Sequence, residues 1–221
     1  MPSKSEQLAY WFFRLNGFLT ITNLVIHTEE YRQGTEIDVI GIRFPFRKEL
    51  RHLTSEGHED FMKDYDAFDI GKTLLIIADA KRGQSDFNEA WKKEENIIRI
   101  LNFVGIVDIA EDHKKDIEPL YSTGKYEGDN LCIRFCLIGR QKYRESQLFP
   151  ESLKITWEEI TDFIYDRFDK YERVKRSHHQ WDETGHLLWK LFKASKDKKE
   201  FHKLVYGIFI SQTQKDLRWT L

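Results

Sequence analysis

Hydrophobic residues recur at helical spacing near the start of the chain. The stripe in residues 3–15 consists of Leu8, Trp11, Phe12 and Leu15. Ser3 and Glu6 have the S-x-x-E spacing of a capping box, which marks the start of a helix. The pattern therefore predicts an opening helix, and the following Asn16-Gly17 predicts its end.

Three segments rich in β-branched and aromatic residues come next, at 18–27, 36–42 and 73–81. The polar, glycine-containing turn between the first two suits a hairpin. Residues 47–70 read as a charged, partly helical insertion. We expect a helix that is capped by Ser85 or Asp86 and ends at Gly105. Glu89 has the capping-box spacing after Asp86, so its side chain can bond the backbone N–H of the cap. Residues 131–139 predict a fourth strand, apolar on both faces.

Residues 108–130 read as an acidic loop, and a long helix is expected at 156–176. Another helix at 181–194 and an apolar segment at 201–210 close the chain. Strands that are apolar on both faces need helices on both sides of their sheet. The order helix, three strands, helix, strand thus predicts a three-layer α/β/α fold. We expect a core at 1–145, with an insertion at 44–71, and a helical extension at 146–221 packed on it.

Composition fits one packed core, since 40% of the 221 residues are hydrophobic and 14% are aromatic. No apolar run reaches the length of a membrane span. The N-terminal segment lacks the layout of a signal peptide, so we expect an intracellular, cytoplasmic protein. Cys132 and Cys136 share a strand face and should be reduced core residues, too few for a zinc site.

Charge is distributed unevenly, although the net charge of −2 gives no global attraction to nucleic acid. Residues 167–221 hold 13 Lys and Arg against 7 Asp and Glu. A basic C-terminal third suggests one face for a polyanion, but a solvated helix face is the commoner source of such charge.

The apolar run at 74–78 leads directly into Asp79 and, two residues later, Lys81. At strand spacing these two side chains share one face with Leu75 and Ile77. Asp38 occupies a similar place in the preceding strand. If the second and third strands pair, the two aspartates meet and repel each other unless a cation lies between them. Mg²⁺, which prefers oxygen ligands, fits such a place.

Glu6 on an opening helix, Asp38 in EIDVIG, and Asp79-Ala80-Lys81 after an apolar strand resemble the PD-(D/E)xK nuclease superfamily. The resemblance covers residues 3–140 and implies a restriction-endonuclease-like core of order αβββαβ. It implies that Asp38, Asp79 and the Ala80 carbonyl hold Mg²⁺, for which Mn²⁺ can substitute, and that Glu6 completes or orients the site. Lys81 would orient the attacking water and stabilise charge on the phosphoryl group, while the cation acts as a Lewis acid.

The chain departs from the family pattern at three points. Asp79 stands where Glu is commoner, and residues 43–72 replace a short hairpin between the second and third strands. Glu36 lies on the same face as Asp38 and offers a second acid. We choose Asp38 because it matches the family position.

Several basic or polar residues near the motif are candidates for nucleic-acid binding. Arg82 and Gln84 follow the motif directly, and Arg140, Lys142 and Arg144 surround Tyr143 after the fourth strand. Such mixtures of basic and aromatic residues can follow a phosphate backbone, although a solvated loop explains them equally well. Other candidates point elsewhere: the histidines 178, 179 and 186 fit no zinc spacing, and Trp157, Trp181 and Trp189 fit a core.

These residues together predict a metal-dependent endonuclease that hydrolyses phosphodiester bonds in DNA, of a restriction, repair or mobile-element defence type. The expected partners are DNA and a second copy of the chain or a larger nuclease, defence or transposition complex; no membrane partner is expected. One alternative is an inactive nuclease-fold subunit that binds nucleic acid or supports assembly. Another is a nuclease acting on RNA or branched DNA, which the sequence does not separate from the first.

Overall fold

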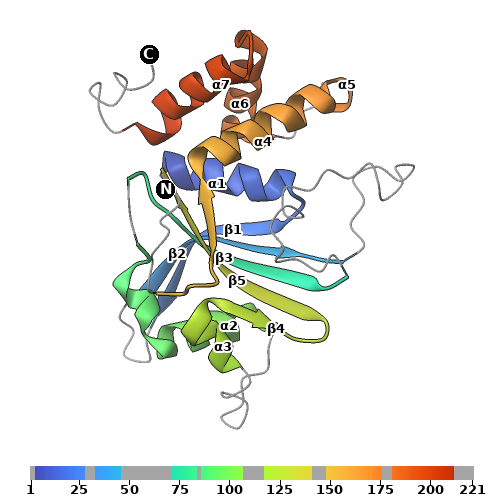
Figure 1. Cartoon of the computed structure of the whole chain (residues 1–221). Coiled ribbons are helices and arrows are strands. Elements are labelled where there is room, and N and C mark those ends of the chain that lie inside the picture. Colours follow the sequence, from blue (N-terminus) through green and yellow to red (C-terminus); the bar gives the residue numbers. More distant parts are fainter. Residues whose placement is uncertain are drawn as a thin grey trace.

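The computed structural model describes residues 3–27, 33–45, 71–83, 86–106, 117–140, 148–175 and 181–211. Six strands form one mixed sheet, and helices cover both of its faces (Figure 1). The fold is therefore a mixed α/β fold, as predicted. Most of the predicted insertion lies outside the described residues, as do Gln84, Lys142, Arg144, His178 and His179.

The sheet is built around two long apolar strands, β3 (Thr73–Ala80) and β5 (Leu131–Gly139), which run parallel. On the other side of β3, β2 (Gln33–Arg43) pairs antiparallel, and β1 (Leu19–His27) pairs antiparallel with β2. Two short strands, β4 (Lys125–Glu127) and β6 (Leu153–Thr156), pair with β5. The four predicted strands and the pairing of the second with the third are confirmed.

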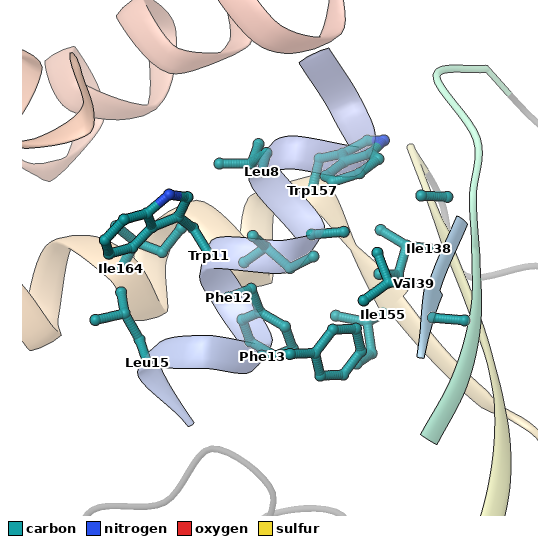
Figure 2. Close-up of a cluster of buried hydrophobic side chains, with 14 of the residues drawn as sticks. Leu8, Trp11, Phe12, Phe13, Leu15, Val39, Ile138, Ile155, Trp157 and Ile164 are labelled. Atoms are coloured by element: carbon teal, nitrogen blue, oxygen red, sulfur yellow. The ribbon is translucent and has the colours of Figure 1, made fainter. Parts of the chain in front are cut away.

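On one side of the sheet, α1 (Lys4–Leu15) lies against the strands and packs with α4 (Trp157–Lys170), while α6 (Glu183–Ala194) and α7 (Lys198–Val205) lie farther out on these two helices (Figure 1). The predicted stripe of α1 packs there against Val39, Ile138, Ile155 and Trp157 (Figure 2). Residues of β3 with even numbers, from Leu74 to Ala80, join the same cluster. The C-terminal helices thus share one core with the strands, and the expected boundary at residue 145 stays a prediction.

The opposite face carries α2 (Glu94–Val104) and α3 (Glu118–Thr123). Leu75 and Ile77 of β3 pack on this side, as their alternation predicted. Four aromatic residues fill the space beside them with mostly edge-to-face contacts: Phe87, Trp91, Phe135 and Phe149. Both cysteines are free and buried, which confirms their prediction as reduced core residues.

The predicted helix from residue 85 or 86 to 105 starts later than expected. A short 3₁₀ turn, η3 (Glu89–Lys92), comes first and has Asn88 as its cap, while Asp86 accepts a hydrogen bond from the Phe87 amide. Only then does α2 begin, with Lys93 as an N-cap that makes no side-chain bond. The helix ends at Gly105, which has a left-handed backbone (φ 66°), as glycine permits.

Other parts of the chain also differ from the prediction. The expected loop at 108–130 contains α3 and β4, and β6 was not predicted. The expected helix at 156–176 is divided: α4 ends at Lys170, Tyr171 interrupts it, and a short α5 (Glu172–Lys175) follows. The final apolar segment extends α7 into a π-helical turn, η5 (Tyr206–Ile210). In the described part of the chain, no helix has the length and apolarity needed to cross a membrane.

Candidate functional site

The two predicted aspartates lie opposite each other on neighbouring strands. Val39 pairs with Ala78, and one step further along this antiparallel register Asp38 of β2 faces Asp79 of β3. Opposite residues in such a pair have Cβ atoms roughly 5 Å apart. The two carboxyl groups are close enough to interact. The charge of Asp79 and a hydrogen bond between the two side chains both raise the pKa of Asp38.

Asp79 is a buried carboxylate, with only 3% of its surface exposed. Its Oδ1 is 2.7 Å from Lys81 Nζ, and its Oδ2 accepts a hydrogen bond from the Asn88 backbone N–H at 3.1 Å. The Lys81 side chain is 29% exposed, so the site reaches solvent at this lysine. The paired charge and the two donors offset the large free-energy cost of burying a carboxylate.

Asp38 is held by the strand that carries the other acid. Its Oδ2 accepts a hydrogen bond of 2.7 Å from the Ala80 backbone N–H. Burial is the main cause that raises the pKa of Asp38 to about 7, although the Ala80 hydrogen bond opposes it; Asp79 and the charge of Glu6 raise it further. At neutral pH this carboxyl is therefore partly protonated.

Glu6 has the structural role that its spacing predicted. Its side chain accepts a hydrogen bond from the Ser3 N–H at 2.9 Å, and the Ser3 hydroxyl caps the Glu6 N–H in return. The contact of 3.4 Å between the Ser5 hydroxyl and Arg82 Nε places the N-terminal turn of α1 near the end of β3, and the charge of Glu6 contributes to raising the pKa of Asp38. The structure thus brings together Glu6, Asp38, Asp79, Ala80 and Lys81.

The backbone of Lys81 is anchored by later parts of the chain. Its N–H donates to the Ile138 carbonyl at 2.8 Å, and its own carbonyl accepts a hydrogen bond from Trp157 Nε1 at 2.9 Å. Trp157 is the first residue of α4 and is buried. These contacts fix the path of the chain immediately after the acids, so the lysine side chain starts from a defined position.

Two of the predicted nucleic-acid contacts lie beside this site. Arg82 Nε is 3.4 Å from the Ser5 hydroxyl on α1, and Arg140 Nε donates to the Arg82 carbonyl at 3.1 Å. The guanidinium of Arg140 also lies 5.5 Å from the ring centre of Tyr206. Lys81, Arg82 and Arg140 therefore form a basic rim around the acids.

The residues that could hold a cation are the two aspartates, whose oxygens have lone pairs left beyond the hydrogen bonds described above. Within the described ranges, no group of three or more His, Cys, Asp or Glu side chains has an arrangement suited to a metal ion. An open hollow of about 400 Å³ lies nearby, lined by Gln7, Tyr10, Thr22, Asp182, Glu183 and Thr184. These six residues carry no positive charge and do not favour a phosphate group.

Two residues that contact the site were not predicted. The Asn88 backbone N–H donates a hydrogen bond to Asp79, and Trp157 Nε1 donates one to the Lys81 carbonyl. A hydrogen bond from a backbone N–H does not depend on the residue type, so the sequence does not indicate it. Trp157 could be expected to make such a contact, because a buried tryptophan needs a partner for its N–H. Its partner could not be predicted, because Lys81 is 76 positions away in the sequence.

Comparisons with protein-family models, with curated proteins and with solved structures found no match to this chain.

Proposed function

We propose that the chain is a Mg²⁺-dependent endonuclease of the PD-(D/E)xK type, with a restriction-endonuclease-like core, that hydrolyses phosphodiester bonds in DNA. The observation that carries this proposal is the pair of half-buried Asp38 and buried Asp79, with the Lys81 ammonium 2.7 Å from Asp79. The order α1, β1, β2, β3, α2, β5 also agrees with that core, with α3 and β4 added before β5.

The proposal explains why the protein keeps costly groups in its interior. Two neighbouring carboxyl groups destabilise a fold when both are ionised, and burial increases the effect. Apolar residues at 38 and 79 would pack in the sheet without this cost. A functional demand for negative oxygen atoms at this point accounts for their presence.

The residues present fit a hard divalent cation. Carboxylate oxygens are the ligands that Mg²⁺ prefers. Burial is the main cause that raises the pKa of Asp38 to about 7, and the nearby charges of Asp79 and Glu6, which raise it further, are charges that a cation would offset. Asp38, Asp79 and the Ala80 carbonyl would hold it, and Glu6 would complete or orient the site. When bound, the cation would supply Lewis-acid polarisation of the phosphoryl group.

Lys81 places its ammonium group between the buried Asp79 and solvent. Its ammonium group, 29% exposed, can hold a water molecule near the scissile phosphate and stabilise charge that develops on the phosphate oxygens. Arg82 and Arg140 on the rim can bind neighbouring phosphates of the backbone.

The direct test is incubation of the purified protein with duplex, single-stranded and branched DNA. We expect cleavage with Mg²⁺ or Mn²⁺ and none with EDTA, and we expect Asp79→Ala to abolish it. Cleavage that survives in Asp79→Ala would show that another acid carries the reaction.

Inactivity on all three DNA forms and on RNA would favour the alternative of a nuclease-fold subunit without turnover. The presence of both acids and the lysine favours the enzyme, because an inactive subunit has no need of buried charge. Activity on RNA or on branched DNA alone would assign the substrate differently and leave the chemistry of the site unchanged.

A further inference from the structure

Asn23 in β1 stands opposite Asp38. Thr22 pairs with Val39 and Leu24 pairs with Ile37, so the residue between them on β1 faces Asp38 on β2. Asp38 in turn faces Asp79 on β3. Asn23, Asp38 and Asp79 therefore lie at one level across three neighbouring strands, and Asn23 is the uncharged member of this row.

The backbone of Asn23 is unusual for a strand. Its φ is 54°, in the left-handed region that non-glycine residues seldom adopt and that Asn tolerates best. Around this level the hairpin turns over: Val39 packs on the α1 face of the sheet, whereas Ile37, two residues earlier, packs on the α2 face. The strand thus changes the face of the sheet on which its side chains pack at the level of the acids.

The side chain of Asn23 has a buried oxygen without a partner. Its Oδ1 is shielded from solvent and receives no hydrogen bond within the described part of the chain. A buried acceptor left without a hydrogen bond destabilises the fold, so a group that binds it would be stabilising. An amide oxygen is also an accepted ligand type for hard divalent cations.

We propose that Asn23 supplies an amide oxygen to the cation site formed by Asp38 and Asp79. The inference rests on the proposed function, since it adds a residue to the same site. It gives the site a third oxygen-bearing side chain, from β1, where the carboxylates alone provide two. The bound cation would also be a partner for the Oδ1 atom that has no hydrogen bond.

The test measures Mn²⁺ binding by electron paramagnetic resonance, without nucleic acid, so that it is independent of cleavage. Asn23→Gly removes the amide and keeps the left-handed backbone, which glycine adopts readily. We expect this variant to fold as the wild type does and to bind Mn²⁺ about tenfold more weakly, the scale on which metal-site partners act. Asn23→Asp keeps an oxygen, adds charge and should bind at least as tightly as the wild type.

Asn16→Ala is the matched control. Asn16 also has a buried Oδ1 without a partner in the described residues, but it is the C-cap of α1, about 15 Å along the helix from Glu6. We expect its Mn²⁺ affinity to equal that of the wild type.

The outcomes separate this inference from the proposed function. Equal affinity in Asn23→Gly and the wild type, or weaker affinity in Asn23→Asp, would overturn the role of Asn23 and leave the proposed nuclease intact. Absence of Mn²⁺ binding by the wild-type protein would overturn both.

Discussion

Lys81 with Asp79 and Lys125 with Glu127 are two ion pairs with the same spacing along a strand. Their N–O distances are 2.7 and 2.8 Å. Asp79 is 3% exposed and has a second acid beside it, whereas Glu127 is 44% exposed on a short edge strand and also has Lys72 within 3.7 Å. The hydrogen bond from Lys125 lowers the pKa of Glu127, while burial raises the pKa of Asp38, the acid that faces Asp79.

The comparison shows what distinguishes a candidate site from an ordinary ion pair. Two-residue spacing of Lys and an acid is common to both and carries no information about function. Burial, a facing carboxyl group and backbone donors occur only at the β3 pair of the two. Variants made in parallel at both pairs can test whether this difference is functional.

The largest expected difference is in the acids. Asp79→Asn should lower Mg²⁺-dependent cleavage by about a thousandfold or more, because it removes the charge of the carboxylate that we propose as a cation ligand, and burial increases the effect of that charge. Glu127→Gln should cleave at the wild-type rate. Rates measured with one labelled duplex at saturating Mg²⁺ check both. Similar rates for the two variants would mean that the Lys81–Asp79 pair has no functional role that the Lys125–Glu127 pair lacks.

The lysines come next. Lys81→Gln keeps a hydrogen-bond donor for Asp79 but loses the charge, and should reduce cleavage about a hundredfold while DNA retardation in EDTA persists. Lys125→Gln should change neither property. A parallel loss of cleavage and binding in Lys81→Gln would make this lysine a general phosphate contact, and an equal effect of Lys125→Gln would deny any special role to the β3 pair.

The pH dependence of stability should also differ. The pKa of Asp38 rises from 3.8 in the unfolded chain to about 7 in the fold. Between these values the folded protein retains a proton that the unfolded chain has lost, so the free energy of unfolding decreases as pH rises from 4 to 7 and levels off above. The expected decrease is roughly 2–4 kcal/mol, since one pKa unit corresponds to about 1.4 kcal/mol.

Thermal melts in EDTA at pH 5 and pH 8 measure this effect. Asp38→Asn resembles the protonated carboxyl and should flatten the dependence, with a higher Tm than the wild type at pH 8. Mg²⁺ should likewise raise the Tm of the wild type at pH 8 if it binds the folded state. A wild-type Tm that is equal at both pH values would mean that Asp38 is not perturbed.

The smallest effect is expected at Glu127. Exposed ion pairs contribute less than about 1 kcal/mol, so Glu127→Gln should shift the unfolding free energy by no more than that at pH 7. Because the pKa of Glu127 is lowered in the fold, even this contribution disappears as the pH falls through that value. Urea denaturation at pH 7 and pH 3 provides the measurement, and a larger shift would show that exposure does not separate the two pairs.

The strongly patterned elements were predictable from sequence. The apolar runs of β3 and β5 and the stripe of α1 each have enough residues to show their period, and Asp79 stands out as a charge at the end of an apolar run. Pairing of β2 with β3 followed from their order. These features were sufficient to bring Asp38 and Asp79 together.

The remaining elements depend on contacts that the sequence does not display. β4 has three residues and exists because β5 offers it an edge, and β6 has four. The delayed start of α2 has a tertiary cause: Asn88 gives its N–H to Asp79 and is extended rather than helical. Asn23 did carry a signal, since Asn is depleted in strands and tolerates a left-handed backbone.

The hydrogen bond between Trp157 and the Lys81 carbonyl joins two parts of the chain that are 76 positions apart. A truncated fragment that stops at residue 145 would keep every acid of the motif but would lose this clamp, and with it β6 and α4 from the side of the sheet. Expression of the motif-bearing half alone is therefore a poor route to an active protein, and a split design would need both pieces to reassociate before the lysine is in place.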